Sequence, residues 1–112
     1  MIAVALIHVR QRRLRDFRRY ERAAARIMRS HGGRIAATVA VAGRPGRAVR
    51  LEIHVLSFPS LRAFRAYHGD ARLQAVAHLR ARSVLASEVL LGRRGPDYHA
   101  RPAKLPRPRL RG

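Results

Sequence analysis

Hydrophobic and polar residues alternate along the stretch from Val49 to Leu56, which reads VRLEIHVL. An alternation of period two is typical of a β-strand whose two faces have different surroundings. One face is wholly apolar, and the other begins with arginine, glutamate and histidine. Because charged groups are not buried in a dry core without partners, we expect the polar face to line water, a partner or a ligand cavity.

Apolar residues at helical spacing predict a first helix over Gln11–His31, which Gly32 and Gly33 can end. Ser60 and Asp70 can cap two later helices. The first of these should bury Leu61, Phe64 and Tyr67, and the second Leu73, Val76, Ala77 and Arg80. The predicted strands are Ile2–Val9, Arg34–Val41, Arg47–Leu56 and Ser83–Leu91, with a turn at Gly43–Gly46.

This order of elements, βαββαβ, predicts an α+β, ferredoxin-like domain over residues 1–92. Its four-stranded antiparallel sheet should carry the helices on one face, with the first strand between the third and fourth. Residues 93–112 form a tail rich in proline and arginine, which we expect to be disordered. A domain this small buries a smaller share of the surface of its unfolded chain than a larger domain does. A homodimer through the open sheet face would therefore stabilise it.

Counting in steps of two, we predict that the open face gathers His8, Glu52, His54 and Glu88, with Arg50 and Thr38 at its edges. Such a group could contact a ligand, act as acid and base, or form a hydrogen-bonded network inside a dimer interface. Metal binding is the weakest alternative, because neither HxH nor HExxH spacing occurs. We therefore predict neither a metal nor a cofactor.

A carboxylate also interrupts the apolar stripe of the first helix, at Glu21. A desolvated carboxyl there would have a raised pKa, as a general acid or base requires. The alternative, which we favour, is that Glu21 meets an arginine or reaches the edge of the stripe.

The formal net charge of +19 comes from 25 basic residues against 6 acidic ones. Such an imbalance attracts polyanions, although a GC-rich genome would also favour arginine over lysine. One arc of the first helix could grip phosphates in a sequence-independent manner, and its residues are Arg15, Arg18, Arg19, Arg22, Arg26 and Arg29. No apolar run is long enough for a membrane helix, and the lack of cysteine fits the cytoplasmic location that we predict.

Several short motifs carry a family resemblance. They are His31–Arg34, Ser57–Leu61, Tyr67, Asp70, Gln74-Ala75, Leu79-Arg80 and Gly92. Together they resemble the bacterial domain-of-unknown-function "thirteen-thirty" family, in the dimeric α/β-barrel superfamily with antibiotic-biosynthesis monooxygenases. The chain departs from the family pattern at Ser57, where a carboxylate is frequent, and at residues 71–73, where Pro-Glu-Tyr is frequent.

The resemblance implies a homodimer and a ligand pocket between the sheet and the partner, with Tyr67 and Arg80 near its mouth. We therefore expect a small-molecule-binding protein. If it is an enzyme, we expect proton transfer or cofactor-independent oxygenation of a small cyclic or aromatic compound. His54 would be the base, and Glu52 or Glu88 would set its tautomer. His8 and Arg50 would contact the ligand. The alternative function is non-specific binding of a polyanion such as nucleic acid, through the arginines of the first helix and the basic tail.

Overall fold

The computed structural model describes residues 1–41 and 48–101. The predicted turn at residues 43–46, the predicted strand start at Arg47 and the tail from residue 102 lie outside the described residues. The elements are the strands β1 (Ile2–Arg10), β2 (Arg34–Ala40), β3 (Val49–Ser57) and β4 (Val84–Gly92), the 3-10 helix η1 (Gln11–Arg13), and the helices α1 (Leu14–Ser30), α2 (Leu61–His68), α3 (Ala71–Ala75) and α4 (Ala77–Ser83).

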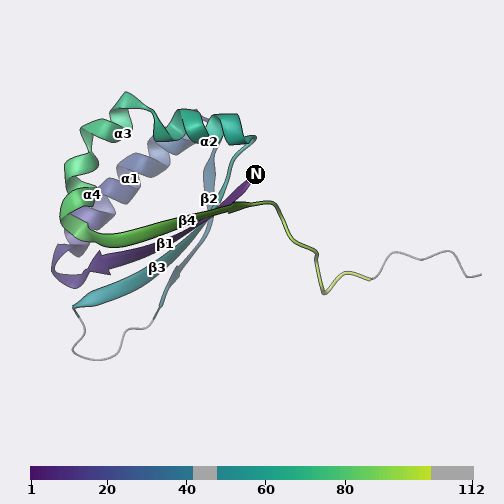
Figure 1. The fold of residues 1–112 in the computed structure, drawn as a ribbon, viewed down its shortest axis with the longest axis horizontal. Helices are drawn as coiled ribbons and strands as arrows, with labels where there is room; N and C mark the ends of the chain where they lie inside the picture. Colours follow the sequence, from purple (N-terminus) through teal and green to yellow (C-terminus); the bar gives the residue numbers. More distant parts are fainter. Residues whose placement is uncertain (42–47, 102–112) are drawn as a thin grey trace, which may run out of the picture.

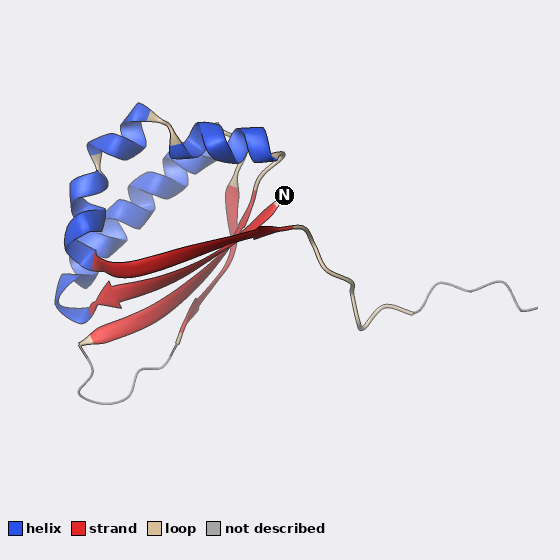
Figure 2. Cartoon of the chain, in the orientation of Figure 1, coloured by secondary structure: helices blue, strands red, loops and turns tan. Residues whose placement is uncertain are grey.

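All four strands form one antiparallel sheet in the order β2-β3-β1-β4, so β1 lies between β3 and β4 as predicted. The helices form a single layer on one face of this sheet, and the described residues leave the other face uncovered (Figure 1; Figure 2). The prediction of an α+β, ferredoxin-like fold is thus confirmed. None of the described helices has the length and apolar character needed to cross a membrane.

The ends of the helices follow from local sequence. Gly32 takes a φ of 75° directly after α1, a conformation that glycine adopts without a steric penalty. The side chain of Ser60 accepts a hydrogen bond from the Ala63 N–H at the start of α2, and that of Asp70 accepts one from the Arg72 N–H at the start of α3.

The last helical segment differs from the prediction, because it breaks at Val76 into α3 and α4. The Val76 N–H bonds to the Leu73 carbonyl three residues back, which tightens the turn and shifts the helical phase of the residues after it. Leu79 is therefore buried in α4, whereas the predicted inner residues Ala77 and Arg80 are exposed. Leu61, predicted to be buried in α2, is 39% exposed; the buried residues of that helix are Phe64 and Tyr67.

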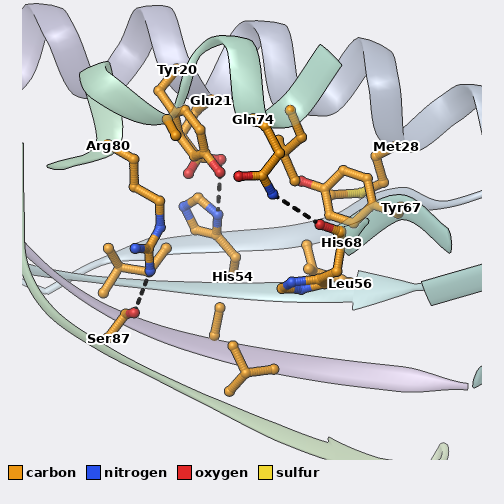
Figure 3. Close-up of a pocket in the computed structure, with 15 residues that line it drawn as sticks. Tyr20, Glu21, Met28, His54, Leu56, Tyr67, His68, Gln74, Arg80 and Ser87 are labelled. Atoms are coloured by element: carbon orange, nitrogen blue, oxygen red, sulfur yellow. Dashed lines mark hydrogen bonds and ion pairs between the residues drawn. The ribbon is translucent and has the colours of Figure 1, made fainter. Parts of the chain in front are cut away.

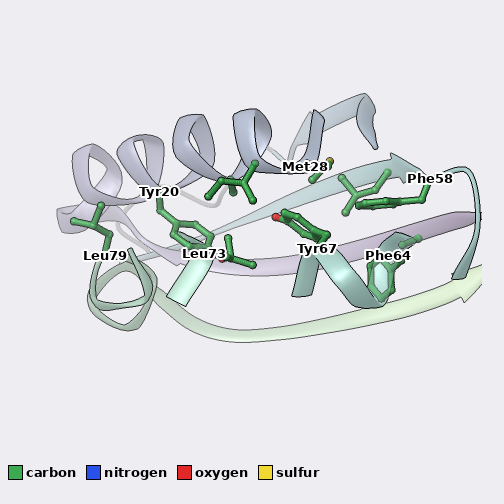
Figure 4. Packing of buried hydrophobic residues seen from close by; sticks show 11 residues of the cluster. Tyr20, Met28, Phe58, Phe64, Tyr67, Leu73 and Leu79 are labelled. Carbon is green, nitrogen blue, oxygen red and sulfur yellow. The ribbon is translucent and has the colours of Figure 1, made fainter. Parts of the chain in front are cut away.

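The core lies between the helix layer and the sheet. Phe58, Phe64 and Tyr67 pack together at one end, with ring centroids 5.3 and 5.5 Å from Phe58 (Figure 4). A smaller cluster at the other end places Phe17 of α1 against the buried side of β1. Between the two clusters, the helix layer and the sheet leave room for a cavity.

The strand register shows which face of β3 meets the helices. His54 pairs with Ala5 of β1, and both residues are buried, with exposed fractions of 3% and 8%. Because directly paired residues point to the same side of a sheet, the polar face of β3 is the helix-covered one. The prediction that Arg50, Glu52 and His54 lie on the open face is wrong for this reason.

The open face carries the apolar residues of β3 instead. Ile53 lies between Leu6 and Val39 of the neighbouring strands, and Val4 pairs with Leu90. Val39 and Leu90 are about half exposed, at 51% and 50%. The alternation of β3 predicts two unlike faces correctly, but β1 is apolar on both sides and so cannot indicate which face the helices cover.

Candidate functional site

A cavity of about 380 Å³ lies between the helix layer and the sheet. Side chains from α1, β3, α2, α3, α4 and β4 point into it (Figure 3). Met28, Leu56 and Val89 supply apolar wall, and the polar lining residues are Tyr20, Glu21, His54, Tyr67, His68, Gln74, Arg80 and Ser87. A small cavity in which several polar groups converge beside an apolar wall is a candidate small-molecule site.

His54 occupies the sheet side of this cavity, and each of its ring nitrogens faces a carboxylate. Nε2 lies 2.8 Å from Glu52 Oε1, within hydrogen-bonding distance, and Nδ1 lies 3.5 Å from Glu21 Oε2. The Phe17 ring is nearly parallel to the imidazole, with centroids 6.2 Å apart. With Nε2–H donating to Glu52, the lone pair of Nδ1 faces Glu21 and the cavity.

Glu21 reaches the cavity from α1, and its side chain is 22% exposed, against 4% for His54. Burial raises the pKa of the Glu21 carboxyl, an effect that the nearby His54 partly offsets. Within the described residues, the basic group beside the Glu21 carboxyl is not the expected arginine but Nδ1 of His54, 3.5 Å away. A carboxyl with a raised pKa beside an imidazole is a candidate proton donor and acceptor.

Two phenols and one guanidinium complete the polar lining. Burial raises the pKa of both Tyr20 and Tyr67, so these side chains are neutral hydrogen-bond donors at ordinary pH. Arg80 donates a hydrogen bond to the Ser87 hydroxyl of β4 at the cavity wall. Burial lowers the pKa of His68, which favours its neutral form. The cavity therefore places a carboxyl–imidazole pair and a guanidinium along the same wall.

The predicted site residues are divided between two places. His54, Tyr67 and Arg80 line the cavity together, and Glu52 contacts His54. Arg50 lies behind them, with its Nη2 3.7 Å from Glu52 Oε2.

His8 and Glu88 lie on the opposite, open face, where they pair with Ala86 and Leu6 of the neighbouring strands. The prediction that these two residues and His54 form one constellation is wrong, because the sheet itself separates them. Glu88 therefore cannot set the tautomer of His54, whereas Glu52 is placed to do so.

Sequence reasoning missed Tyr20, His68 and Gln74 as lining residues. Tyr20 falls within the apolar stripe of α1 and looks like an ordinary core residue. Gln74 of α3 and His68 of α2 are exposed polar residues that sequence periodicity does not distinguish from an ordinary solvent face. Glu21 does give a signal, since a carboxylate inside an apolar stripe needs a buried partner or a functional reason.

Solved structures with the same fold include several proteins at low sequence identity. A protein of unknown function from Rhodopseudomonas palustris aligns with a TM-score of 0.63 at 17% identity, over 85% of this chain and 83% of that one. The cofactor-independent oxygenase SnoaB from Streptomyces nogalater aligns with a TM-score of 0.58 at 12% identity, over 84% and 94% of the two chains. An antibiotic biosynthesis monooxygenase gives a TM-score of 0.62 at 11% identity, over 86% and 100%.

These likenesses show the fold, whereas the sequence shows the family. No curated protein has a significant sequence match to this chain. The sequence profile described as "Domain of unknown function (DUF1330)" matches residues 3–91, from the first strand to the last. The chain therefore belongs to the DUF1330 family.

Proposed function

We propose that this protein binds a small cyclic or aromatic compound in the cavity between its helices and its sheet, and removes a proton from it. The observation that carries the proposal is the contact between Glu21 and His54 at the cavity wall, with 3.5 Å between Oε2 and Nδ1. Proton transfer requires a group of suitable pKa within reach of the ligand. Glu21 has a raised pKa and faces the cavity.

The division of labour follows from exposure. His54 is almost fully buried, so a ligand proton reaches its Nδ1 through the carboxylate of Glu21, which is more exposed. Glu52 accepts the Nε2–H hydrogen bond, which holds the ring in place and stabilises positive charge on it. The anion left on the ligand would be stabilised by the guanidinium of Arg80 and by the phenol of Tyr67.

The lining also restricts the ligand class. A volume of about 380 Å³ admits a small ring system, and Met28, Leu56 and Val89 favour an apolar ring over a sugar or a nucleotide. The proton must be acidic enough for a carboxyl–imidazole pair to remove, which suits a phenol or an enolisable ketone. Removing such a proton makes the ligand electron-rich. Oxygen uptake is therefore the readout that separates oxygenation from simple proton transfer.

We also propose that two copies pair through their open sheet faces. Apart from His8 and Glu88, most residues of this face are apolar, and Val39 and Leu90 are about half exposed in a single copy. An apolar face of this kind on a small domain is typical of a surface that a partner covers. The ligand cavity lies on the opposite side of the sheet, so in this proposal the partner supports the sheet and does not form the pocket.

The experiment is a ligand screen with a matched pair of histidine variants. Substituted phenols and cyclic diketones are screened by thermal shift against the wild type, His54→Gln and His8→Gln. His54 and His8 lie on neighbouring strands but on opposite faces. We expect each hit to raise the melting temperature of the wild type and of His8→Gln equally. Its affinity for His54→Gln should be at least about tenfold weaker, with a correspondingly smaller thermal shift.

For each hit, deuterium incorporation from D₂O and oxygen consumption are then followed with the wild type and Glu21→Gln. Exchange or oxygen uptake by the wild type that Glu21→Gln loses supports the proposal. Equal ligand shifts in His54→Gln and the wild type, or equal turnover by Glu21→Gln, would contradict it.

A further inference from the structure

The outer face of α1 carries a row of arginines that the proposed pocket chemistry does not use. Arg15, Arg18, Arg19, Arg22, Arg26 and Arg29 are all exposed, and they fall within an arc of about 100° at helical spacing. From the first to the last, at about 1.5 Å per residue, the row extends about 21 Å. It therefore forms a line of positive charge, with roughly one or two arginines per turn.

These arginines lack acidic partners within the described part of the chain. All six acidic residues of the sequence lie in that part. The ion pairs there engage Asp16 with Arg13, Asp70 with His31 and Arg72, and Glu52 with Arg50, and both Glu21 and Glu52 lie beside His54. No ion pair to the row is found among residues 1–41 and 48–101. Its charge is thus available to an external anion.

A groove along α1 concentrates this charge. It has a volume of about 280 Å³ and is lined by Arg19, Arg22 and Arg26, with Ala23 beside them and Val76 and Leu79 opposite. The buried side chain of Leu79 and the half-buried one of Val76 give the groove an apolar floor. Low-dielectric walls focus the field of charges of one sign, so the groove strengthens the attraction of these three arginines for an anion.

We propose that this arginine row and its groove bind the phosphate backbone of nucleic acid without sequence preference. A single phosphate would occupy only part of a line about 21 Å long, whereas a duplex presents a phosphate every 3.4 Å or so along each strand. The arc holds no apolar side chain that could insert into a bilayer, which disfavours a membrane. It holds no aromatic side chain for base stacking either, so the contacts are to the backbone.

The test compares two triple variants with the same change in net charge. The groove variant, Arg19→Gln/Arg22→Gln/Arg26→Gln, removes the three arginines that line the groove. The control variant, Arg62→Gln/Arg65→Gln/Arg82→Gln, removes three exposed arginines of α2 and α4 that lie outside it. Binding of the full chain to fluorescent DNA duplexes of about 20 base pairs, with two unrelated sequences, is measured between about 50 and 200 mM salt. Circular dichroism verifies the folding of each variant.

We expect the groove variant to lower the slope of log affinity against log salt by about 2 to 3, since each lost phosphate contact removes about 0.9. The control triple should change it by less than about 1. The two duplex sequences should bind equally. Equal losses in both triples would mean that only total charge matters, and would overturn the site.

Two further binding measurements identify which kind of polyanion binds the arginine row. The wild type, the groove variant and the control variant are each titrated with polyglutamate and with vesicles containing phosphatidylserine. Weaker binding of both than of DNA at equal salt supports nucleic acid. Equal or tighter binding of either one, with the same dependence on the groove arginines, would overturn nucleic acid as the occupant, and so would the absence of DNA binding at about 50 mM salt.

Discussion

Along β3, the two faces of the sheet gather opposite kinds of side chain between Arg50 and His54. Beneath the helices, β3 presents Glu52 and His54, which are paired with each other and with Glu21 of α1. On the open side the same strand presents Ile53, flanked by Leu6 and Val39. The usual expectation, apolar residues toward the helices and polar ones toward water, is reversed for this strand.

The reversal is possible because the buried polar groups have partners. In the described residues, no fully buried side-chain nitrogen or oxygen lacks a hydrogen-bond partner. A cavity rather than close packing lies above His54, so a ligand or water can reach Glu21. The alternation along a strand therefore shows that its two faces have different environments. The neighbouring elements decide which of the two faces the helices cover.

The largest contrast between the faces should appear in stability. Phe17 is 2% exposed and packs against His54 and the buried side of β1, so Phe17→Ala should lower the free energy of unfolding by about 3–5 kcal/mol. Val39→Ala, on the open face of a single copy, should cost at most about 1 kcal/mol. Urea denaturation of dilute protein measures both. Similar costs would mean that the open face is as well packed as the core.

Charge placed on the open face should act on assembly instead. Leu90→Glu should weaken a homodimer at least about a hundredfold, because two-fold symmetry repeats the buried charge in the partner. Leu61→Glu on α2, at a residue of similar exposure away from the sheet, serves as the control and should have little effect. Sedimentation of the full chain tests this. A wild type that stays monomeric at micromolar concentration would contradict the pairing.

The pH dependence of stability distinguishes the helix-covered face further. Burial raises the pKa of Glu21 above its ordinary value of 4.5, so the folded protein holds this proton more tightly than the unfolded chain does. The stability that this difference contributes is fully present below the pKa of Glu21 in the unfolded chain. It is lost as pH rises through the pKa of Glu21 in the folded protein.

Glu21→Gln removes that loss, so its stability relative to the wild type should increase as pH rises above 4.5. Glu88→Gln, on the open face, is the matched control and should follow the wild type. Thermal melts across the pH range give the answer. A Glu21→Gln curve parallel to the wild type would show that the buried carboxyl does not titrate abnormally.

The smallest expected effect is at Tyr67. Its hydroxyl faces the cavity, so Tyr67→Phe should change stability by less than about 0.5 kcal/mol. Affinity for a phenol or diketone hit should fall about three- to tenfold, the loss of one hydrogen bond. A destabilisation above about 2 kcal/mol, with unchanged affinity, would mean that the hydroxyl of Tyr67 supports the fold and does not contact the ligand.

The sequence predicts the fold better than it predicts the site. Periodicity predicts the order of the strands and helices. The caps at Ser60 and Asp70 and the glycine after α1 also indicate where helices begin and end. The site depends on which side of the sheet receives the helices, and an apolar β1 leaves that undetermined. For this reason alone the prediction groups His8 and Glu88 with His54, although Tyr67 and Arg80 do line the same cavity as His54.

The break at Val76 limits the prediction in a second way. It depends on a local three-residue turn that packing favours, and no proline or glycine marks it. Because of this break, Leu79 is buried and Arg80 is exposed, the reverse of the predicted environments. Features set by packing between elements, rather than within one, are therefore the ones that sequence periodicity cannot supply.

The histidine side chains report directly on whether the ligand binds at the helix-covered face. Imidazole ¹H–¹⁵N NMR spectra of the full chain are recorded while a phenol or diketone from the screen is added. His54 should show a protonated Nε2 held by Glu52, and its Nδ1 resonance should move on ligand addition, while His8 stays unchanged. A ligand that shifts His8 and leaves His54 unmoved would place the binding site on the open face and contradict the account.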